Sequence, residues 1–350
     1  MAPHTPHKTS RFSLLGPKLR PKGSRRATII ILVLVSFASL AFVVTEIIAA
    51  ATARLQWENQ RTRHDALRTE AFSALETTLA VLGAFARIDG TLYGPAQGWS
   101  DPLEFANFSV GDDATSVTIS LHDESGCYGL PALAADTFAS RRFFQDLGIS
   151  ETQAYSLADC LADWTDAGDT ARLNGAERDR YPEGVAPPNR PVQNLDELRL
   201  VQGFAETFFD DAGNGNELWE HFSAAISLVG SSARPNINTA PAAVLDILAS
   251  RYAFTPEAII AAREGSSNIG GTGTIYRNAA DLGRAGFPVA LADAVSFSCT
   301  RLRVIARASS GGVSVVVDTL LDTSAGGGNA STTQFPFAII QQRVNALLQE

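Results

Sequence analysis

The chain has 350 residues, enough for one large or two ordinary domains with a buried core, and its 45% hydrophobic content is ordinary for a globular protein. The first 26 residues carry seven bases and no acid, whereas 21 bases face 37 acids in residues 27–350, a formal charge of −16. This acidic balance argues against binding of nucleic acid or anionic lipid and favours cations or basic partners.

A membrane-spanning helix is predicted near the N-terminus. Residues 27–45 (ATIIILVLVSFASLAFVVT) are 19 residues without a charge, Pro or Gly. At about 1.5 Å of rise each they cover about 28 Å as a helix, close to the hydrocarbon thickness of a bilayer. We predict a basic cytoplasmic leader over residues 1–23, a transmembrane helix over 24–53 and the remainder outside, because the flanking bases favour the cytoplasmic side.

Two other interpretations of this segment are open. A cleaved secretory signal usually has a shorter apolar run that ends at a turn, whereas this run passes directly into a helix-forming segment. A leader of the type IV pilin kind is cut on the cytoplasmic side after a glycine, so that the helix is kept. Gly23 followed by Ser24 is the candidate cut, and it leaves Arg25 and Arg26 before the apolar run.

The helix is predicted to continue from Ala53 to about Ile88. Its apolar residues recur every three or four positions and share one face of the helix. They are Leu67, Ala71, Leu75, Leu79, Leu82 and Ala86. Glycines and a proline then end the helix, and Phe108–Val110 and Ser116–Leu121 are predicted as two short strands. The pattern predicts a long helix packed on a small antiparallel sheet.

Helical patterns dominate the next part of the chain. The predicted helices are Ala132–Asp146, Ser150–Thr165, Leu195–Phe204, Glu217–His221, Ala240–Tyr252, Pro256–Glu264 and Asn278–Ala285. Strands return at Arg301–Ala308 and Val313–Asp318, joined by a Gly311–Gly312 turn, with a last strand at Phe335–Gln341.

The order of sheet, helical block and sheet predicts an α+β fold. A pilin-like long N-terminal helix packs on a small antiparallel sheet, and a large α-helical domain is inserted between strands. The predicted domains are the helix with the first strands over 54–126, the inserted α-domain over 127–292, and the strands that complete the sheet over 293–350.

An acidic segment follows the predicted helix that ends at Thr165. Five carboxylates stand within 17 residues, with glycines that bend the backbone. They are Asp163, Asp166, Asp169, Glu177 and Asp179. Hard oxygen ligands at this density are what calcium requires, although the spacing is not that of an EF-hand. A solvated acidic loop paired to Arg172, Arg178 and Arg180 is the alternative.

No catalytic constellation is recognised, and the chain is predicted not to be an enzyme. Its histidines lack metal-ligand spacing, and no serine sits in a nucleophile elbow. The segment 235–245, followed by a helix at Pro256, resembles the opening of a helix-hairpin-helix module, many of which hold DNA phosphates. Its link, residues 250–255, has no glycine. Asn236 and Asn238 are therefore interpreted as turn and capping residues.

Four features together resemble the K-type minor pseudopilin of the type II secretion system (general secretion pathway protein K). They are the acidic segment 157–181 (LADCLADWTDAGDTARLNGAERDRY), the pair Pro187–Pro191 and Leu195–Val201, the Asn236–Pro241 hairpin, and the apolar N-terminal helix. The resemblance covers nearly the whole chain from Gly23 onwards. It implies a pilin-like domain with a large inserted α-domain and calcium in that insert, for which the five carboxylates are the candidate ligands.

The resemblance also implies a structural protein of the bacterial inner membrane, with a cytoplasmic N-terminus and a periplasmic C-terminal domain. Its partners would be the I-type and J-type minor pseudopilins, the major pseudopilin, the prepilin peptidase and secreted substrate, but not nucleic acid. The resemblance places such a protein at the tip of the periplasmic pseudopilus. After a cut at Gly23, Thr28 would be the fifth residue, where other pseudopilins carry a glutamate.

Three cysteines, Cys127, Cys160 and Cys299, permit one disulfide in an exported domain and leave an odd thiol. Spacing alone does not decide the pairing, and three unpaired thiols is the alternative. Within the resemblance Cys127 opens the α-domain and Cys160 lies on an early helix of it, so a bond between them would fasten the entrance of the insert.

Two other functions are consistent with the sequence. One is a membrane-tethered periplasmic DNA-binding module of helix-hairpin-helix type, as in competence proteins. The other is a pseudopilin of a related type IV pilus machine.

Overall fold

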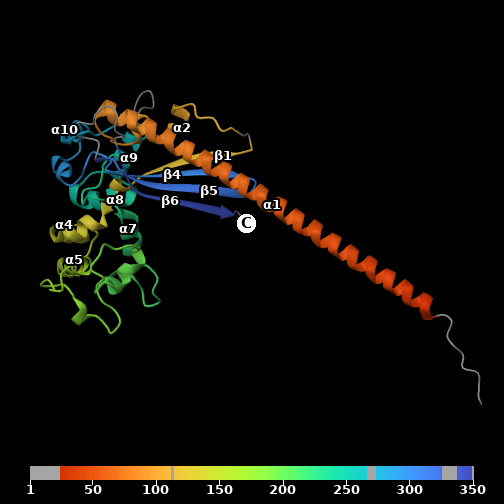
Figure 1. Ribbon diagram of the computed structural model, residues 1–350. Coiled ribbons are helices and arrows are strands. Elements are labelled where there is room, and N and C mark those ends of the chain that lie inside the picture. The colour runs from red at the N-terminus through yellow and green to blue at the C-terminus, as the bar shows by residue number, and fades with distance from the viewer. Residues whose placement is uncertain (1–23, 112–113, 266–272, 325–336, 349–350) are drawn as a thin grey trace, which may run out of the picture. The chain divides into compact units, whose positions relative to one another are not determined.

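The computed structural model describes residues 24–111, 114–265, 273–324 and 337–348 (Figure 1). The chain divides into two compact units, Met1–Thr62 and Arg63–Glu350. Gly23, and with it the candidate cut, lies outside the described residues, as does the glycine run 326–328.

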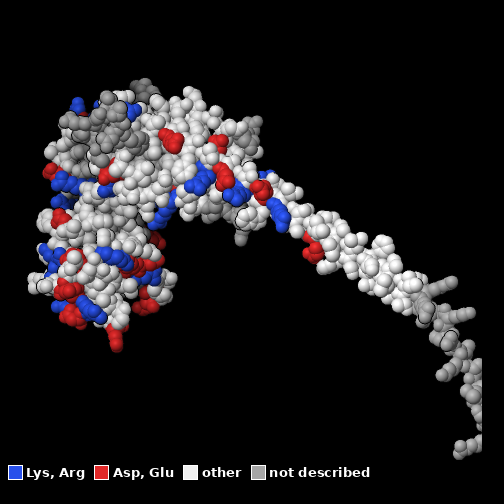
Figure 2. All heavy atoms as spheres, viewed as in Figure 1, with Lys and Arg blue, Asp and Glu red and all other residues white. Residues whose placement is uncertain are grey.

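In the first unit the described residues all belong to helix α1 (Ser24–Asp89). From Thr28 onwards it is long and apolar enough to cross a membrane, and its side chains in this unit are exposed. Ser36, Thr45 and Thr52 donate their hydroxyls to carbonyls one turn earlier, which satisfies these groups within an apolar stretch. Figure 2 shows this stretch almost free of charged side chains.

In the second unit a four-stranded antiparallel sheet has the order β1-β4-β5-β6 (Figure 1). Its strands are β1 (Ser116–Asp123), β4 (Arg301–Ser310), β5 (Val313–Asp322) and β6 (Ala338–Leu348). Gly311 and Gly312 join β4 to β5 with φ angles of 56° and 79°, which glycine adopts without strain. The predicted hairpin is confirmed.

The part of α1 in this unit packs on the sheet through the predicted apolar face. Leu67, Leu75 and Leu82 are buried against alternate residues of β4 and β5. Those strand residues are Leu302, Val304, Ala306 and Ala308 on β4 and Val315, Val317 and Leu321 on β5. The helix residues that recur every three or four positions thus pack against strand residues that recur every two positions, and together they form the core of the pilin-like part.

Everything between Asp123 at the end of β1 and Arg301 at the start of β4 is inserted between two neighbouring strands. The helices of this insert are α3 (Leu130–Ala135), α4 (Thr137–Asp146), α5 (Glu151–Thr165), α6 (Phe204–Phe208), α7 (Glu217–Ala225), α8 (Ala242–Tyr252), α9 (Pro256–Arg263) and α10 (Ala279–Arg284). A short parallel pair, β2 (Tyr128–Gly129) and β3 (Ile226–Ser227), was not predicted.

The insert has a core of its own, separate from the core between α1 and the sheet. Phe144, Phe204, Phe208 and Phe222 pack there with ring centroids 5.0–6.4 Å apart. The α+β fold with an α-domain inserted between strands is therefore confirmed.

Three predicted elements were wrong in detail. Phe108–Val110 is not a strand, because the N–H of Phe108 bonds to Leu103 O and closes the turn after α2 (Pro102–Phe105). The helix predicted over Ala132–Asp146 is two helices, because the Asp136 side chain caps α4 by accepting from two backbone N–H groups. Residues Leu195–Leu200 form a 3₁₀ helix rather than an α-helix.

Candidate functional site

The acidic loop begins at the last turn of α5. Asp163 is fully buried and accepts a hydrogen bond from the backbone N–H of Arg172 at 3.0 Å, and its carboxylate also pairs with the Arg172 guanidinium. Asp166 pairs with the same guanidinium. A Cβ atom at Gly175 would lie 1.9 Å from Asp163 Oδ2, so only glycine allows this close approach.

Glu177 is the member of this loop whose charge is least compensated. Its side chain is 5% exposed, and its Oε1 has no hydrogen-bond partner among the described residues. Burial raises the pKa of this carboxyl, and the nearby charges of Asp163, Asp166 and Asp169 raise it further. Asp179, the fifth predicted candidate, is exposed on the 3₁₀ turn Arg178–Arg180. Of the five candidates, Asp163, Asp166 and Asp169 thus lie close enough to Glu177 for their charges to act on it, and Asp179 does not join them.

The residue types of the loop fit calcium. A buried carboxylate oxygen without a partner, close to three other carboxylates, is an arrangement that a hard cation would neutralise. In the structure Arg172 supplies the positive charge for Asp163 and Asp166. In the described part of the chain no three His, Cys, Asp or Glu side chains are already arranged to hold a metal ion. The geometry is that of an ion-paired loop, which calcium would have to rearrange.

Sequence reasoning missed Asp159, which fixes the loop from the preceding turn of α5. This carboxylate is 1% exposed, accepts from Arg141 Nη2 at 2.7 Å and accepts from the Asn174 side-chain amide at 3.1 Å. Asp159 and Asp163 are four residues apart on one helix, so both face the loop. That spacing was the signal that could have identified Asp159.

The three cysteines are free thiols, and the predicted bond between Cys127 and Cys160 is not formed. Cys160 is buried on α5, where its Sγ donates to Asn174 O at 3.5 Å. Cys127 instead lines a cavity between the end of β1 and the α8–α9 segment. The two thiols contact different surroundings, so this bond does not fasten the insert. Burial raises the pKa of the Cys127 thiol to about 12, and the Glu124 charge adds to the effect.

Asn238 lies in a buried hydrogen-bond network. Its Nδ2 donates to Tyr276 O at 2.8 Å and to Phe297 O at 3.0 Å, while its Oδ1 accepts from the Tyr276 N–H at 2.8 Å. One side chain therefore joins the start of α8 to two later segments of the insert.

Asn236 extends the same network toward the sheet. Its Oδ1 accepts from the Asn238 N–H at 3.1 Å, which is the predicted turn. Its Nδ2 donates to Tyr93 O at 2.7 Å and to Asp123 Oδ2 at 2.8 Å. The predicted capping role is wrong, because α8 begins only after Pro241 and has no side-chain cap.

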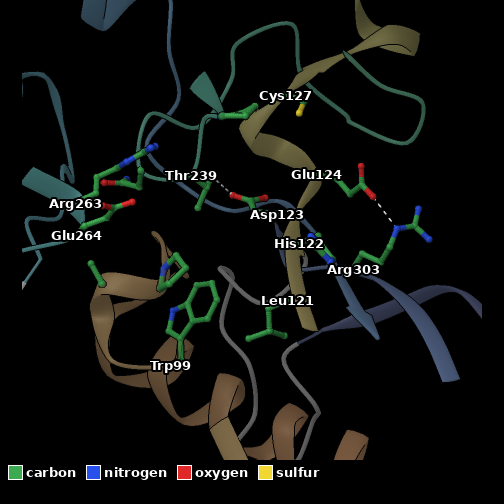
Figure 3. Close-up of a pocket in the computed structure, with 14 residues that line it drawn as sticks. Trp99, Leu121, His122, Asp123, Glu124, Cys127, Thr239, Arg263, Glu264 and Arg303 are labelled. Carbon is green, nitrogen blue, oxygen red and sulfur yellow. Dashed lines mark hydrogen bonds and ion pairs between the residues drawn. The ribbon is translucent and has the colours of Figure 1, made fainter. Parts of the chain in front are cut away.

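The network closes one wall of a cavity of about 590 Å³ at the junction of sheet and insert (Figure 3). Asp123 accepts a hydrogen bond from Thr239 Oγ1, and Glu124 pairs with Arg303 across the other side. Burial raises the pKa of Asp123, while its hydrogen bonds oppose the shift. These lining groups bind one another and hold the insert to the sheet.

The hairpin formed by α8 and α9 makes its contacts within the insert. Phe254, in the link, packs edge-on against Phe287 with ring centroids 6.1 Å apart. Arg263 on α9 donates from Nη1 to Ile237 O and Ala240 O, both at 3.0 Å, and therefore ties α9 to the turn before α8. The link between α8 and α9 and the Arg263 guanidinium therefore make contacts that stabilise the insert.

Comparisons with known proteins agree with this geometry. Residues 121–212, which contain the acidic loop, match the family model of protein K of the type II secretion system (T2SS). The chain is 27% identical over 219 residues to the type II secretion system protein K of Aeromonas hydrophila. That alignment covers 55% of this chain and spans 62% of the length of the curated relative.

Among solved structures, the crystal structure of the GspK-GspI-GspJ complex from the enterotoxigenic Escherichia coli type 2 secretion system contains a similar chain. The TM-score is 0.54 at 14% identity, with 83% of this chain and 99% of that chain covered, so this likeness shows the fold.

A long apolar helix packs on a small antiparallel sheet, and a helical domain is inserted between neighbouring strands; this pilin-like arrangement is the fold that the chain shares with the solved structure. The match over residues 121–212 and the curated relative show that this part of the chain is similar to protein K of the type II secretion system.

Proposed function

We propose that this chain is a minor pseudopilin of the type II secretion system, a structural and non-enzymatic part of the periplasmic pseudopilus. The observation that carries the proposal is the α-domain inserted between β1 and β4, with its acidic loop inside the region that matches the protein K family. The family match favours the secretion system over a related type IV pilus. The inward use of the α8–α9 hairpin argues against the DNA-binding alternative.

The proposed place is the tip of the pseudopilus, beside the I-type and J-type minor pseudopilins and above the major pseudopilin. Two features support it. A bulky insert suits a subunit with none above it, and Thr28 replaces the glutamate that other pseudopilins use to pair with a neighbouring N-terminus. The chain would be held in the inner membrane by α1, with the second unit in the periplasm, where it can touch secreted substrate.

Processing by the prepilin peptidase is part of the proposal. A cut after Gly23 keeps the apolar helix and gives a mature chain that begins at Ser24. Intact-mass spectrometry of the chain, co-expressed with the peptidase of the same bacterium, is expected to find this start. Expression without the peptidase is the control. A mature chain that begins after Ala53 would contradict the proposal, because the helix would then be discarded.

Assembly with minor pseudopilins tests the function directly. The tagged full chain, extracted in mild detergent, is expected to co-purify with the I-type and J-type minor pseudopilins of the same bacterium. A single-span periplasmic protein with the same tag is the control. If neither pseudopilin co-purifies and the chain instead shifts duplex DNA at physiological salt, the assembly function is wrong and the DNA-binding module is favoured.

We also propose that calcium binds the acidic loop through Asp163, Asp166, Asp169 and Glu177. The unpartnered Oε1 of Glu177 and the nearby negative charges of Asp163, Asp166 and Asp169 support this. When bound, calcium would supply the positive charge that these oxygens lack, and it would fix the loop between α5 and the following segment.

A further inference from the structure

Strand β6 leaves an apolar surface open at one edge of the sheet. It pairs with β5 on one side, and within the described residues no strand lies on its other side (Figure 1). Ile339 is 53% exposed and Val344 is 41% exposed, whereas their partners Leu321 and Val317 on β5 are fully buried. An edge strand that exposes apolar side chains in this way is normally covered in the working protein.

The register shows which face of the sheet is open. Residues directly opposite each other in an antiparallel pair point to the same face. Val317 and Leu321 pack against α1, so Val344 and Ile339, their partners on β6, lie on the face that carries the helix. Gln342 completes this row, and its Nε2 donates to Thr319 Oγ1 at 3.1 Å. The charged side chain of Arg343 belongs to the other face, opposite Asp318.

The width of the sheet explains why β6 is uncovered. Strands lie about 4.8 Å apart, and a helix with its side chains is about 10 Å across, so one helix covers about two strands. The buried sheet residues that pack with α1 are on β4 and β5. Packed helices lie about 8–10 Å apart, and a second helix beside α1 at that spacing would therefore lie over β6.

The chemistry of the row favours a helix over a strand as its occupant. An added strand would pair with the free N–H and C=O groups of the β6 edge, but it would leave Ile339 and Val344 open to solvent. A helix with an uncharged apolar stripe, like the stripe by which α1 covers β4 and β5, would bury both side chains.

We propose that β6 is a docking site for the apolar N-terminal helix of a neighbouring pseudopilin, which lies beside α1 against Ile339, Gln342 and Val344. The inference rests on the proposed function, because that function supplies neighbours with helices of this kind. It names the surface of this chain that such a neighbour covers.

Neighbouring residues on β6 give a matched pair for the test. Val344 faces the proposed helix, whereas Asn345 is exposed on the opposite face, opposite Val316. Since both are already exposed, polar substitutions at either position are compatible with folding, which thermal melts of each variant would verify. In the full chain, Val344→Asp is expected to weaken co-purification with the I-type or J-type minor pseudopilin by about tenfold or more. Asn345→Asp is expected to change it by less than about twofold.

Photo-crosslinking identifies the occupant. With p-benzoylphenylalanine in place of Val344, irradiation of the co-expressed complex is expected to give a product that maps to the N-terminal helix of the neighbouring subunit. The same probe in place of Asn345 is expected to give no such product. A product that maps to a partner strand, or to a second copy of this chain, overturns the proposal.

A failure of the proposed docking site can be distinguished from a failure of the proposed function. If the unmodified chain binds the minor pseudopilins but Val344→Asp and Asn345→Asp bind alike, the docking site is wrong and the proposed function stands. If the unmodified chain binds neither, both are wrong.

Discussion

Replacing Asn238 by alanine (Asn238→Ala) is expected to lower the free energy of unfolding by about 3 kcal/mol. The side chain is 7% exposed, and it satisfies the Tyr276 N–H together with the carbonyls of Tyr276 and Phe297. Alanine would leave these buried backbone groups without partners, which costs more than the hydrogen bonds themselves contribute. Urea titration of the full chain in mild detergent, followed by tryptophan fluorescence, measures the change.

Two further variants separate the network from general effects. Asn238→Asp keeps the shape and the acceptor but loses the donor. If the carboxylate stays ionised in this buried place, the free energy of unfolding should fall by as much as in Asn238→Ala or by more. Gln202→Ala removes an exposed amide side chain and should change stability by less than about 0.5 kcal/mol. Equal midpoints for Asn238→Ala and Gln202→Ala would show that the network does not hold the insert together.

Calcium is expected to raise the melting temperature of the chain by roughly 3–5 °C relative to the same chain in excess chelator. At a free concentration about 100 times the dissociation constant, a ligand that binds only the folded state adds about 2.7 kcal/mol. With an unfolding entropy of about 2.1 cal/mol/K per residue, each kcal/mol corresponds to roughly 1–2 °C for a protein of this size. Magnesium at the same concentration is the control, because it demands near-ideal octahedral geometry and dehydrates reluctantly. Identical melting temperatures in calcium and chelator would reject the site.

The effect of Glu177→Gln on the stability of the chain is expected to reverse when calcium is added. Without calcium the variant is expected to be more stable than the unmodified chain at pH 7, because it removes a buried charge that burial and three neighbouring carboxylates disfavour. With calcium it should be less stable, because a ligand is lost. Asp179→Asn, on the exposed turn, should have little effect in either condition. A Glu177→Gln effect of the same sign in both conditions would exclude this carboxylate as a ligand.

The pH dependence follows from the direction of the pKa shift. The folded chain binds the Glu177 proton more tightly than the unfolded chain, in which the pKa is about 4.3. Calcium-free stability should therefore rise as the pH falls through the raised pKa, and the advantage of Glu177→Gln should disappear in the same range. Calcium should weaken this dependence, because a bound cation favours the ionised carboxylate.

The sequence predicted correctly those elements that a short local motif or a periodic apolar pattern determines. The apolar face of α1 and the β4–β5 hairpin were predicted correctly, because a repeat of three to four residues and a Gly-Gly turn are visible without tertiary information. The break between α3 and α4 was missed, since the capping bonds of Asp136 compete with a helix that its neighbours would otherwise continue.

Contacts between distant residues could not be predicted in this way. Asn236 was identified as a turn residue, but its partners Tyr93 and Asp123 lie more than 100 positions earlier. The acidic loop was recognised from its composition, whereas the ion pairs of Arg172 with Asp163 and Asp166 depend on how the loop folds back. The family resemblance suggested a bond between Cys127 and Cys160, but the two thiols lie in separate surroundings and do not form it.

The insertion between β1 and β4 has a consequence for the order of folding. Asp123 and Leu302 are direct partners in the sheet, so both ends of the insert leave it side by side. Because a chain is synthesised from its N-terminus, β1 is present long before β4 is available to pair with it. The insert, with its separate core, can become compact during that interval, and the sheet is then the last part to close.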